Sequence, residues 1–132
     1  MKYLGLDYGE RRIGVAVSDG DGKMAFPKYV EVAGGPERWR VVARNLKKII
    51  EEENIGGVVL GLPLGFSMQE TEMTKKVRDF GEFLKKELNI ELFFQNEVLT
   101  SKEVEKSGVA REGMLDASSA ALILQSFLDA KS

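Results

Sequence analysis

Three acidic residues stand where their side chains could take part in one reaction. Asp7 ends an apolar segment near the start of the chain, Glu97 follows a later apolar segment, and Asp116 precedes apolar residues at helical spacing. Apolar neighbours crowd Asp7, and burial of a carboxylate is costly unless a cation or hydrogen-bond donors compensate its charge. The residues that bind such a cation, or that donate such hydrogen bonds, have to come from elsewhere in the chain.

The composition restricts the chemistry that such carboxylates can support. The chain has no His and no Cys, which excludes a Ser-His-Asp triad, a His or thiolate metal site and a disulfide. Three anions in a water-poor cleft need raised pKa values or a bound cation, and carboxylate oxygens suit hard divalent ions. The expected cofactor is Mg²⁺ or Mn²⁺, one ion or two, which would activate water for phosphodiester cleavage.

Each of these residues, taken alone, has a plainer explanation. Asp116 could be the N-cap of the last helix or a favourable charge at its N-terminus, and Glu97 could be a surface turn residue. Arg11 and Arg12 follow the turn after Asp7, where they could contact phosphates or be ordinary solvated side chains. If the strand before Glu97 lies near the strand that ends in Asp7, the three acids converge. Their combination therefore favours catalysis over the separate explanations.

Length, charge and hydropathy bound the class of protein. The 132 residues predict one domain over residues 1–132, and 43% apolar with 30% charged residues is typical of a globular protein. No signal-sequence pattern or membrane-length apolar run is found, so we expect a cytoplasmic protein without membrane contact. A net charge of −2 argues against a basic nucleic-acid coat but allows local contact through a metal-charged cleft.

Hydrophobic patterns predict an α/β fold in the order βββαβαβα, with an antiparallel meander followed by parallel crossover strands. The predicted strands cover residues 2–7, 12–18, 23–30, 57–61 and 90–95. The predicted helices cover about 36–53, 70–88 and 115–130. A short helix over 101–107 and a connection over 108–113 would precede the last helix.

The last helix should carry Asp116 toward the sheet. Asp116 shares a helical stripe with Ala120, Ile123 and Phe127, and such a stripe is the face that a surface helix buries. One face of the strand over 12–18 has only small side chains after its first residue, which would let a helix approach closely. We therefore expect Asp116 at the edge of the core rather than in solvent.

Several segments together resemble the YqgF/RuvX family, and the resemblance spans nearly the whole chain. These segments are Leu4-Gly-Leu-Asp-Tyr-Gly9, Arg12-Ile-Gly-Val-Ala-Val-Ser-Asp19, Gly61-Leu-Pro63, Glu97 with Leu99-Thr100, Asp116-Ala117, Ala120-Ala121 and Ile123-Leu-Gln125. Members of the family are described as pre-16S rRNA nucleases, and earlier as Holliday-junction resolvase-like proteins. The first and last motifs together are specific, whereas the glycine-rich hairpin alone would not be.

The resemblance implies an RNase H-like fold with a five-stranded mixed sheet flanked by helices. It implies a metal-dependent nuclease in which Asp7, Glu97 and Asp116 are the catalytic, metal-binding acids and the substrate is the 5′ end of pre-16S rRNA. Arg11, Arg12 and Thr100 are the expected substrate contacts. The expected partners are RNA, with structured or branched DNA as a further substrate class, and a second copy of the chain in a weak homodimer.

Three other functions fit parts of the same sequence. A Holliday-junction-type DNA resolvase would use the same acids, whereas a non-catalytic RNA-binding module would explain why Asn96 and Val98 stand where the family usually has Asp and Arg. Asp7-Tyr-Gly9 followed by Gly14 also resembles the first phosphate loop of actin-like nucleotide-binding proteins. Those proteins enclose a nucleotide between two domains, and this chain supplies one.

Overall fold

The computed structural model describes residues 1–98 and 112–131, and it describes side chains in 1–98 and 117–131. The elements are β1 (Tyr3–Tyr8), β2 (Arg12–Ser18), β3 (Ala25–Val32), the 3-10 helix η1 (Pro36–Arg38), α1 (Trp39–Glu52), β4 (Gly57–Leu64), α2 (Glu72–Leu88), β5 (Glu91–Val98) and α4 (Glu112–Lys131). The predicted order βββαβαβα is confirmed. Within the described ranges, no helix is long and apolar enough to cross a membrane.

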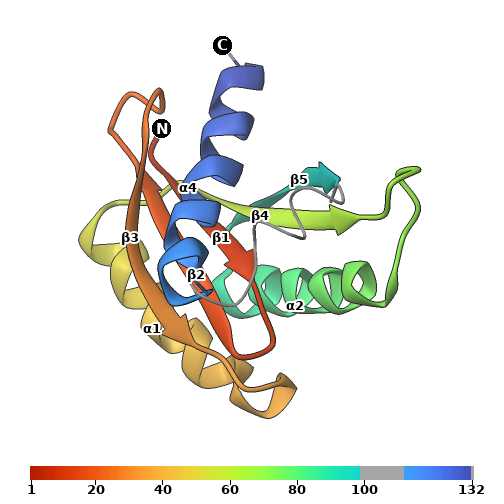
Figure 1. Cartoon of the computed structure of the whole chain (residues 1–132). Helices are drawn as coiled ribbons and strands as arrows, with labels where there is room; N and C mark the ends of the chain where they lie inside the picture. Colours follow the sequence, from red (N-terminus) through yellow and green to blue (C-terminus); the bar gives the residue numbers. More distant parts are fainter. Residues whose placement is uncertain (99–111, 132) are drawn as a thin grey trace.

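The sheet has five strands in the order β3-β2-β1-β4-β5. Hairpins make β1, β2 and β3 antiparallel, whereas the crossovers through α1 and α2 make β4 parallel to β1 and β5 parallel to β4. Helix α4 lies on one face of the sheet, and α1 and α2 lie on the other (Figure 1). The C-terminal ends of β1, β4 and β5 therefore meet at one edge.

The larger part of the core lies between the sheet and helices α1 and α2. Leu4 and Leu6 of β1 pack there with Leu46 of α1 and with Phe80 of α2. The start of α2 is fixed by a capping box, since Thr71 and Thr74 each accept a hydrogen bond from the backbone N–H of the other. The Thr74 hydroxyl also donates to the Pro63 carbonyl of β4, which ties the helix to the strand end.

On the opposite face, α4 approaches the sheet closely because the strands present small residues. A Cβ atom on Gly5 would lie 2.7 Å from Leu124 Cβ, and one on Gly61 would lie 2.5 Å from Ile123 Cδ1. Ala16 and Ala120 are fully buried in the same cluster. The predicted burial of the α4 stripe is thus confirmed over its described side chains.

Gly5→Ala should destabilise the protein by about 1–3 kcal/mol, because the added methyl group overpacks the contact with Leu124. Without that contact the substitution would favour folding, since Ala loses less backbone entropy than Gly. Urea unfolding measures the change in free energy. Gly20→Ala is the control, since a Cβ there meets nothing within 4 Å. Equal unfolding free energies for the two variants would contradict the close seating of α4.

Two strand ends differ from the prediction at places that matter for the site. Strand β4 continues to Leu64 through a predicted loop, and Glu97 lies within β5 rather than after it. The register explains both, because β4 and β5 remain paired as far as Leu64 and Val98. Pro63 is tolerated because β1 pairs with β4 only as far as Leu60, which leaves that side of Pro63 without a strand partner.

The start of α4 corrects one explanation of Asp116. The helix begins at Glu112, so Asp116 is its fifth residue and cannot be its N-cap. The helix predicted over 101–107 lies outside the described residues, as does 108–111 of the predicted connection, whereas residues 112 and 113 belong to α4. Strand β3 is shifted by two residues, to Ala25–Val32.

A buried carboxylate on β3 links the sheet to α1. Glu31 accepts hydrogen bonds from the Tyr29 hydroxyl at 2.7 Å and from Asn45 Nδ2 at 2.6 Å. Burial, and then the hydrogen bond and negative charge of Glu31, raise the pKa of Tyr29 well above its usual value. The fold therefore holds this phenol in its neutral form.

The raised pKa of Tyr29 predicts a loss of stability at high pH. Above about pH 10 the unfolded chain loses the phenol proton while the folded chain keeps it, so the free energy of unfolding falls as pH rises. Tyr29→Phe should cost about 1 kcal/mol at pH 8 through the lost hydrogen bond. Urea titrations from pH 8 to 11 should show that this difference from wild type shrinks with pH. A constant difference would be contrary to this account.

Candidate functional site

A pocket opens at the edge of the sheet where β1, β4 and β5 end. Its cavity volume is about 400 Å³. The lining residues come from the strand ends and from two helices: Asp7, Tyr8, Gly61, Pro63, Met73, Glu97, Val98, Ser119, Leu122 and Ile123. Two of the three predicted acids therefore line one cavity, which we call the acidic pocket.

Strand alternation places Asp7 on the α4 face of the sheet. Leu4, Leu6 and Tyr8 belong to the core on the α1 and α2 side, so the side chain between Leu6 and Tyr8 points the other way. Asp7 is half-buried, as its apolar neighbours predicted. Its partner in the β2 register is Gly14, which has no side chain to cover the carboxylate from that flank.

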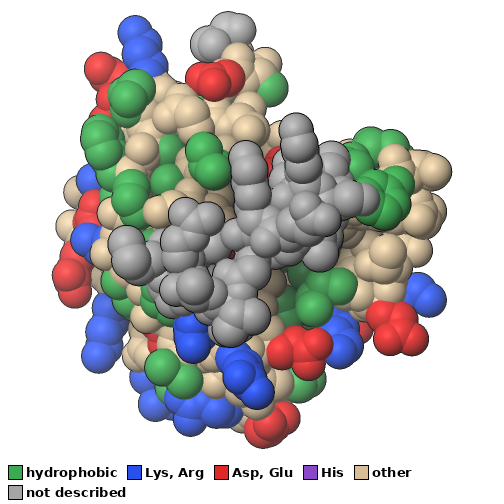
Figure 2. Space-filling model, viewed as in Figure 1, with side chains coloured by type: hydrophobic (Ala, Val, Ile, Leu, Met, Phe, Trp, Pro, Cys, Tyr) green, Lys and Arg blue, Asp and Glu red, His purple; other side chains and the backbone are tan. Residues whose placement is uncertain are grey.

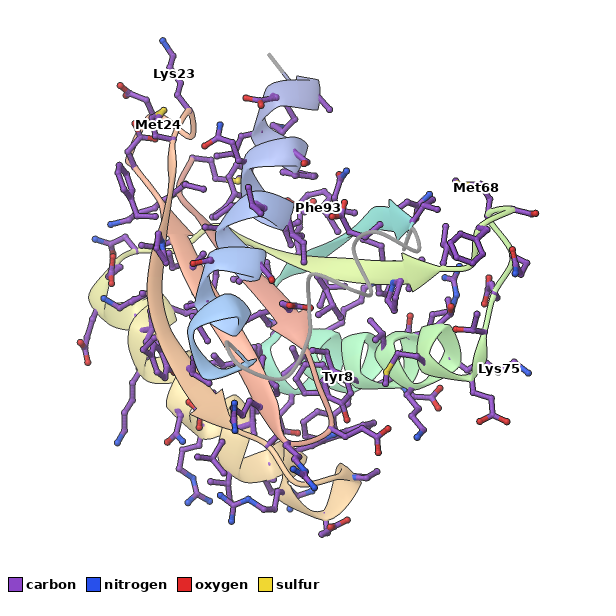
Figure 3. All side chains as sticks on the ribbon, in the orientation of Figure 1. Tyr8, Lys23, Met24, Met68, Lys75 and Phe93 are labelled. Carbon is purple, nitrogen blue, oxygen red and sulfur yellow. The ribbon has the colours of Figure 1, made fainter. Side chains whose placement is uncertain are left out.

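Glu97 reaches the same face from β5. Phe93 packs under α4 (Figure 3). Leu92 and Phe94 pack on the α1 and α2 side, and Glu97, four residues after Phe93 in the same strand, shares the face of Phe93. Glu97 is half-buried and is level with Pro63 in the sheet register. Strand β4 lies between β1 and β5, so the backbones of the two outer strands are about 10 Å apart.

The strand between the two acids allows the pocket to form. Gly61 of β4 is one residue beyond Leu60, the partner of Leu6, and so lies level with Asp7. Because Gly61 has no side chain, Ile123 of α4 reaches the sheet there and closes the back of the pocket. Asp7 and Glu97 line the cavity on either side of this contact.

The third acid lies on the helix that covers the pocket. Asp116 is three residues before Ser119 and seven before Ile123, both of which line the cavity, and these spacings keep residues on one side of a helix. The Asp116 side chain is outside the described part of the chain, and among the described side chains no group of three acids that could hold a metal is found. Its approach to Asp7 and Glu97 stays a prediction.

The three predicted substrate contacts occupy different positions. Arg12 begins β2 and shares the strand face of Gly14 and Ala16, so it lies on the α4 side with Asp7. Arg11 is exposed in the turn and lines a different groove, on the side of α1 and α2. Thr100 lies outside the described residues. Arg11 and Arg12 therefore lie on different faces of the sheet, and their contact with phosphates stays a prediction.

Sequence reasoning missed several residues of the pocket wall. Ser119 could have been found, because it is one helical turn from Asp116. Leu122 is 69% exposed beside the cavity, which no sequence pattern indicated. Met73 lies in the helix predicted over 70–88, and its place in the pocket depends on the path of the crossover between β4 and α2.

Comparison with known proteins gives matches along nearly the full chain. The family model described as "RuvX: Holliday junction resolvase" matches residues 1–130. A protein of Nitratidesulfovibrio vulgaris is 40% identical over 98% of this chain and 94% of its own length. One of Oleidesulfovibrio alaskensis is 38% identical over 98% and 92%. Both relatives are named "Putative pre-16S rRNA nuclease".

Solved structures share the fold at low sequence identity. The structure of Thermus thermophilus RuvC aligns with a TM-score of 0.59 and 15% identity, over 99% of this chain and 96% of that one. The same protein in complex with a Holliday junction substrate aligns with a TM-score of 0.57 and 16% identity, over 99% and 95%. These likenesses show an RNase H-like fold of the RuvC type, as expected.

Proposed function

The chain belongs to the RuvX family, and on that premise we propose that it is a metal-dependent nuclease that cleaves precursor 16S rRNA near the 5′ end of the mature sequence. The observation that carries the proposal is the acidic pocket, where Asp7 and Glu97 arrive from strands that are not neighbours. Relatives 38–40% identical over almost their whole lengths carry the name of this activity.

The donor set of the pocket fits a hard divalent cation. Asp7 and Glu97 offer carboxylate oxygens, Ser119 offers a hydroxyl, and the chain has no His or Cys that would favour a softer metal. We infer that Asp7, Glu97 and Asp116 would hold Mg²⁺ or Mn²⁺. When bound, the cation supplies an activated water and stabilises negative charge on the leaving oxygen.

The chain's own residues prepare the pocket for a phosphodiester. The carboxylates of Asp7 and Glu97 repel a phosphate unless a cation is shared, which restricts productive binding to the metal-loaded form. The side chains of Leu122 and Ile123 make part of the cavity wall apolar. Arg12, on the same face as Asp7, provides a positive charge within reach of the phosphate backbone.

Asn96, one of the two residues behind the non-catalytic alternative, gives that alternative no support. Asn96 is exposed and alternates with Glu97 along β5, so its side chain lies on the opposite face of the sheet. The residue at 96 therefore contributes no ligand to the pocket. Branched DNA is the second candidate substrate, favoured by the description of the matching family as a Holliday junction resolvase.

A cleavage assay separates these functions. Wild-type protein is incubated with a precursor 16S rRNA fragment that spans the 5′ processing site and with a four-way DNA junction, each in Mg²⁺, Mn²⁺ or EDTA. We expect cleavage of the RNA with either metal, slower or no cleavage of the junction, and no cleavage in EDTA. Faster cleavage of the junction would identify a resolvase, and no cleavage of either substrate would identify a binding module.

A further inference from the structure

A second hollow lies at the end of β1, on the α1 and α2 side of the sheet. Its cavity volume is about 420 Å³, and its wall includes Tyr8, Arg11, Trp39 and Lys76. We call it the Trp39 groove. Tyr8 also lines the acidic pocket, because β1 ends between the two hollows. We propose that the Trp39 groove binds an unpaired nucleotide of the RNA strand whose scissile phosphate lies in the acidic pocket, an inference that rests on the nuclease function proposed above.

The indole ring of Trp39 is held in place before any ligand binds. Its Nε1–H donates to the Tyr8 hydroxyl at 3.4 Å. The Phe80 and Phe83 rings pack against it, with centroids 5.4 Å and 5.6 Å away. Trp39 is nevertheless only half-buried, so part of the ring faces the groove. A fixed, partly open aromatic ring is a platform for stacking of a nucleobase of any type.

The groove itself is nearly neutral, which suits a base better than a phosphate. Lys76 forms an ion pair with Glu10 at 3.1 Å across its wall, so much of the charge of both is compensated. Asp79, also on the wall, offers an acceptor for the amino group of a base, and the exposed Arg11 offers one positive charge. The phosphates on either side of the base need cations outside the groove.

Helix α1 provides those cations next to Trp39. Arg40, Arg44 and Lys47 recur at helical spacing on its exposed side and, with Glu87 of α2 opposite, line a shallow groove of about 220 Å³. We call these three residues the α1 basic stripe. None of them takes part in an ion pair with another described residue.

The positive charge on α1 is local rather than general. Residues 36–48 contain five basic and one acidic residue, whereas the whole chain has a formal net charge of −2. Figure 2 shows Lys and Arg side chains gathered along the lower edge of the molecule, where Figure 1 places α1. A single strand leaving the acidic pocket would pass Tyr8, place a base on Trp39 and run its phosphates along the α1 basic stripe. This combination of a stacking ring and a basic track is typical of single-strand binding.

Trp39 is the only Trp of the chain, so its fluorescence reports on the groove directly. The probe is a single-stranded RNA of about 12 nucleotides, which covers a typical single-strand site. It is titrated against the Asp7→Asn protein, which should bind RNA without cutting it. Saturable quenching of Trp39, with the same Kd as fluorescence anisotropy of a labelled RNA, is the expected result. RNA binding by anisotropy without a change at Trp39 would overturn the proposal.

Charge variants test the path beyond the groove. The double variant Arg44→Gln with Lys47→Gln should raise KM for precursor RNA about tenfold at unchanged kcat, and should lower the salt slope of binding by about 1.4. Lys85→Gln with Lys86→Gln is the control, because it removes the same charge from exposed residues in the last turn of α2. Lys85 and Lys86 line neither the Trp39 groove nor the groove beside the α1 basic stripe. Equal KM values for the two double variants would overturn the path along α1.

The two proposals can fail separately. If the wild type cleaves RNA but RNA binding leaves the fluorescence of Trp39 unchanged, the groove assignment is wrong and the nuclease function stands. If the wild type cleaves nothing, but RNA quenches Trp39 and the Arg44→Gln, Lys47→Gln protein binds more weakly than the control, the nuclease function is wrong and the RNA path stands.

Discussion

Asp7→Asn is expected to lower metal-dependent RNA cleavage by about 10³-fold or more while leaving the protein folded. Asn keeps the size of the side chain and removes the negative charge that a divalent cation requires. Because Asp7 lies one residue before the end of β1 and lines the acidic pocket, the lost ligand lies where the phosphodiester must bind. The effect should fall on kcat, since the Trp39 groove and the α1 basic stripe still bind RNA. Single-turnover cleavage of the precursor fragment in Mn²⁺ measures it.

The control for Asp7 is an acid of the same type outside the pocket. Asp21 is exposed in the turn between β2 and β3, and Asp21→Asn makes the same chemical change. It should cut at the wild-type rate. Circular dichroism and thermal unfolding confirm that both variants are folded. Wild-type cleavage by a folded Asp7→Asn protein would show that the acidic pocket is not the catalytic site.

Glu97→Gln should have the second-largest effect, a fall in cleavage of about 10²-fold or more with weaker binding of Mn²⁺. Gln retains the length and one oxygen of the side chain, so the loss reports on charge rather than on shape. Glu97 is half-buried within a strand that pairs with β4, which holds its backbone in place during binding. Cleavage rates over a series of Mn²⁺ concentrations separate metal affinity from the maximal rate.

The chain offers a matched control for Glu97 on the same strand. Glu91 begins β5, lies on the same strand face by alternation and is exposed at the opposite edge of the sheet. Glu91→Gln should retain wild-type cleavage and Mn²⁺ dependence. If both variants lose the same activity, the charge of Glu97 has no particular role, and β5 acts only as a structural strand.

The arrangement of the helices could be predicted from local sequence, because the signal is periodic. The small face of β2 and the stripe through Ala120 and Ile123 indicated a helix lying close to the sheet, and the buried cluster under α4 contains them. The ends of β4 and β5 could not be predicted in the same way. Pro63 argues for a loop when only the sequence is considered. It fits a strand only because β1 stops pairing at Leu60, a property of the sheet rather than of the segment.

Only the part of the candidate site that depends on local sequence was predictable. Asp7 and Glu97 could be chosen because each is an acid near the end of an apolar strand, and the absence of His and Cys favoured oxygen-ligated metals. The Trp39 groove was not predictable, because its residues come from three separate segments: Tyr8 and Arg11 from the first hairpin, Trp39 from α1 and Lys76 from α2. Trp39 lies within the helix predicted over 36–53, and nothing in that helical pattern indicates a ligand contact.

Binding of Mn²⁺ tests the central claim most directly, because it measures the shared cation itself. Electron paramagnetic resonance of free Mn²⁺ should show one or two ions bound to the wild type, with Kd raised about tenfold or more in Asp7→Asn, Glu97→Gln and Asp116→Asn, and unchanged in Asp21→Asn. The Asp116 variant is decisive, since it tests whether α4 brings the third carboxylate to the pocket. Wild-type Mn²⁺ affinity in all three acid variants would contradict a metal site formed by these residues.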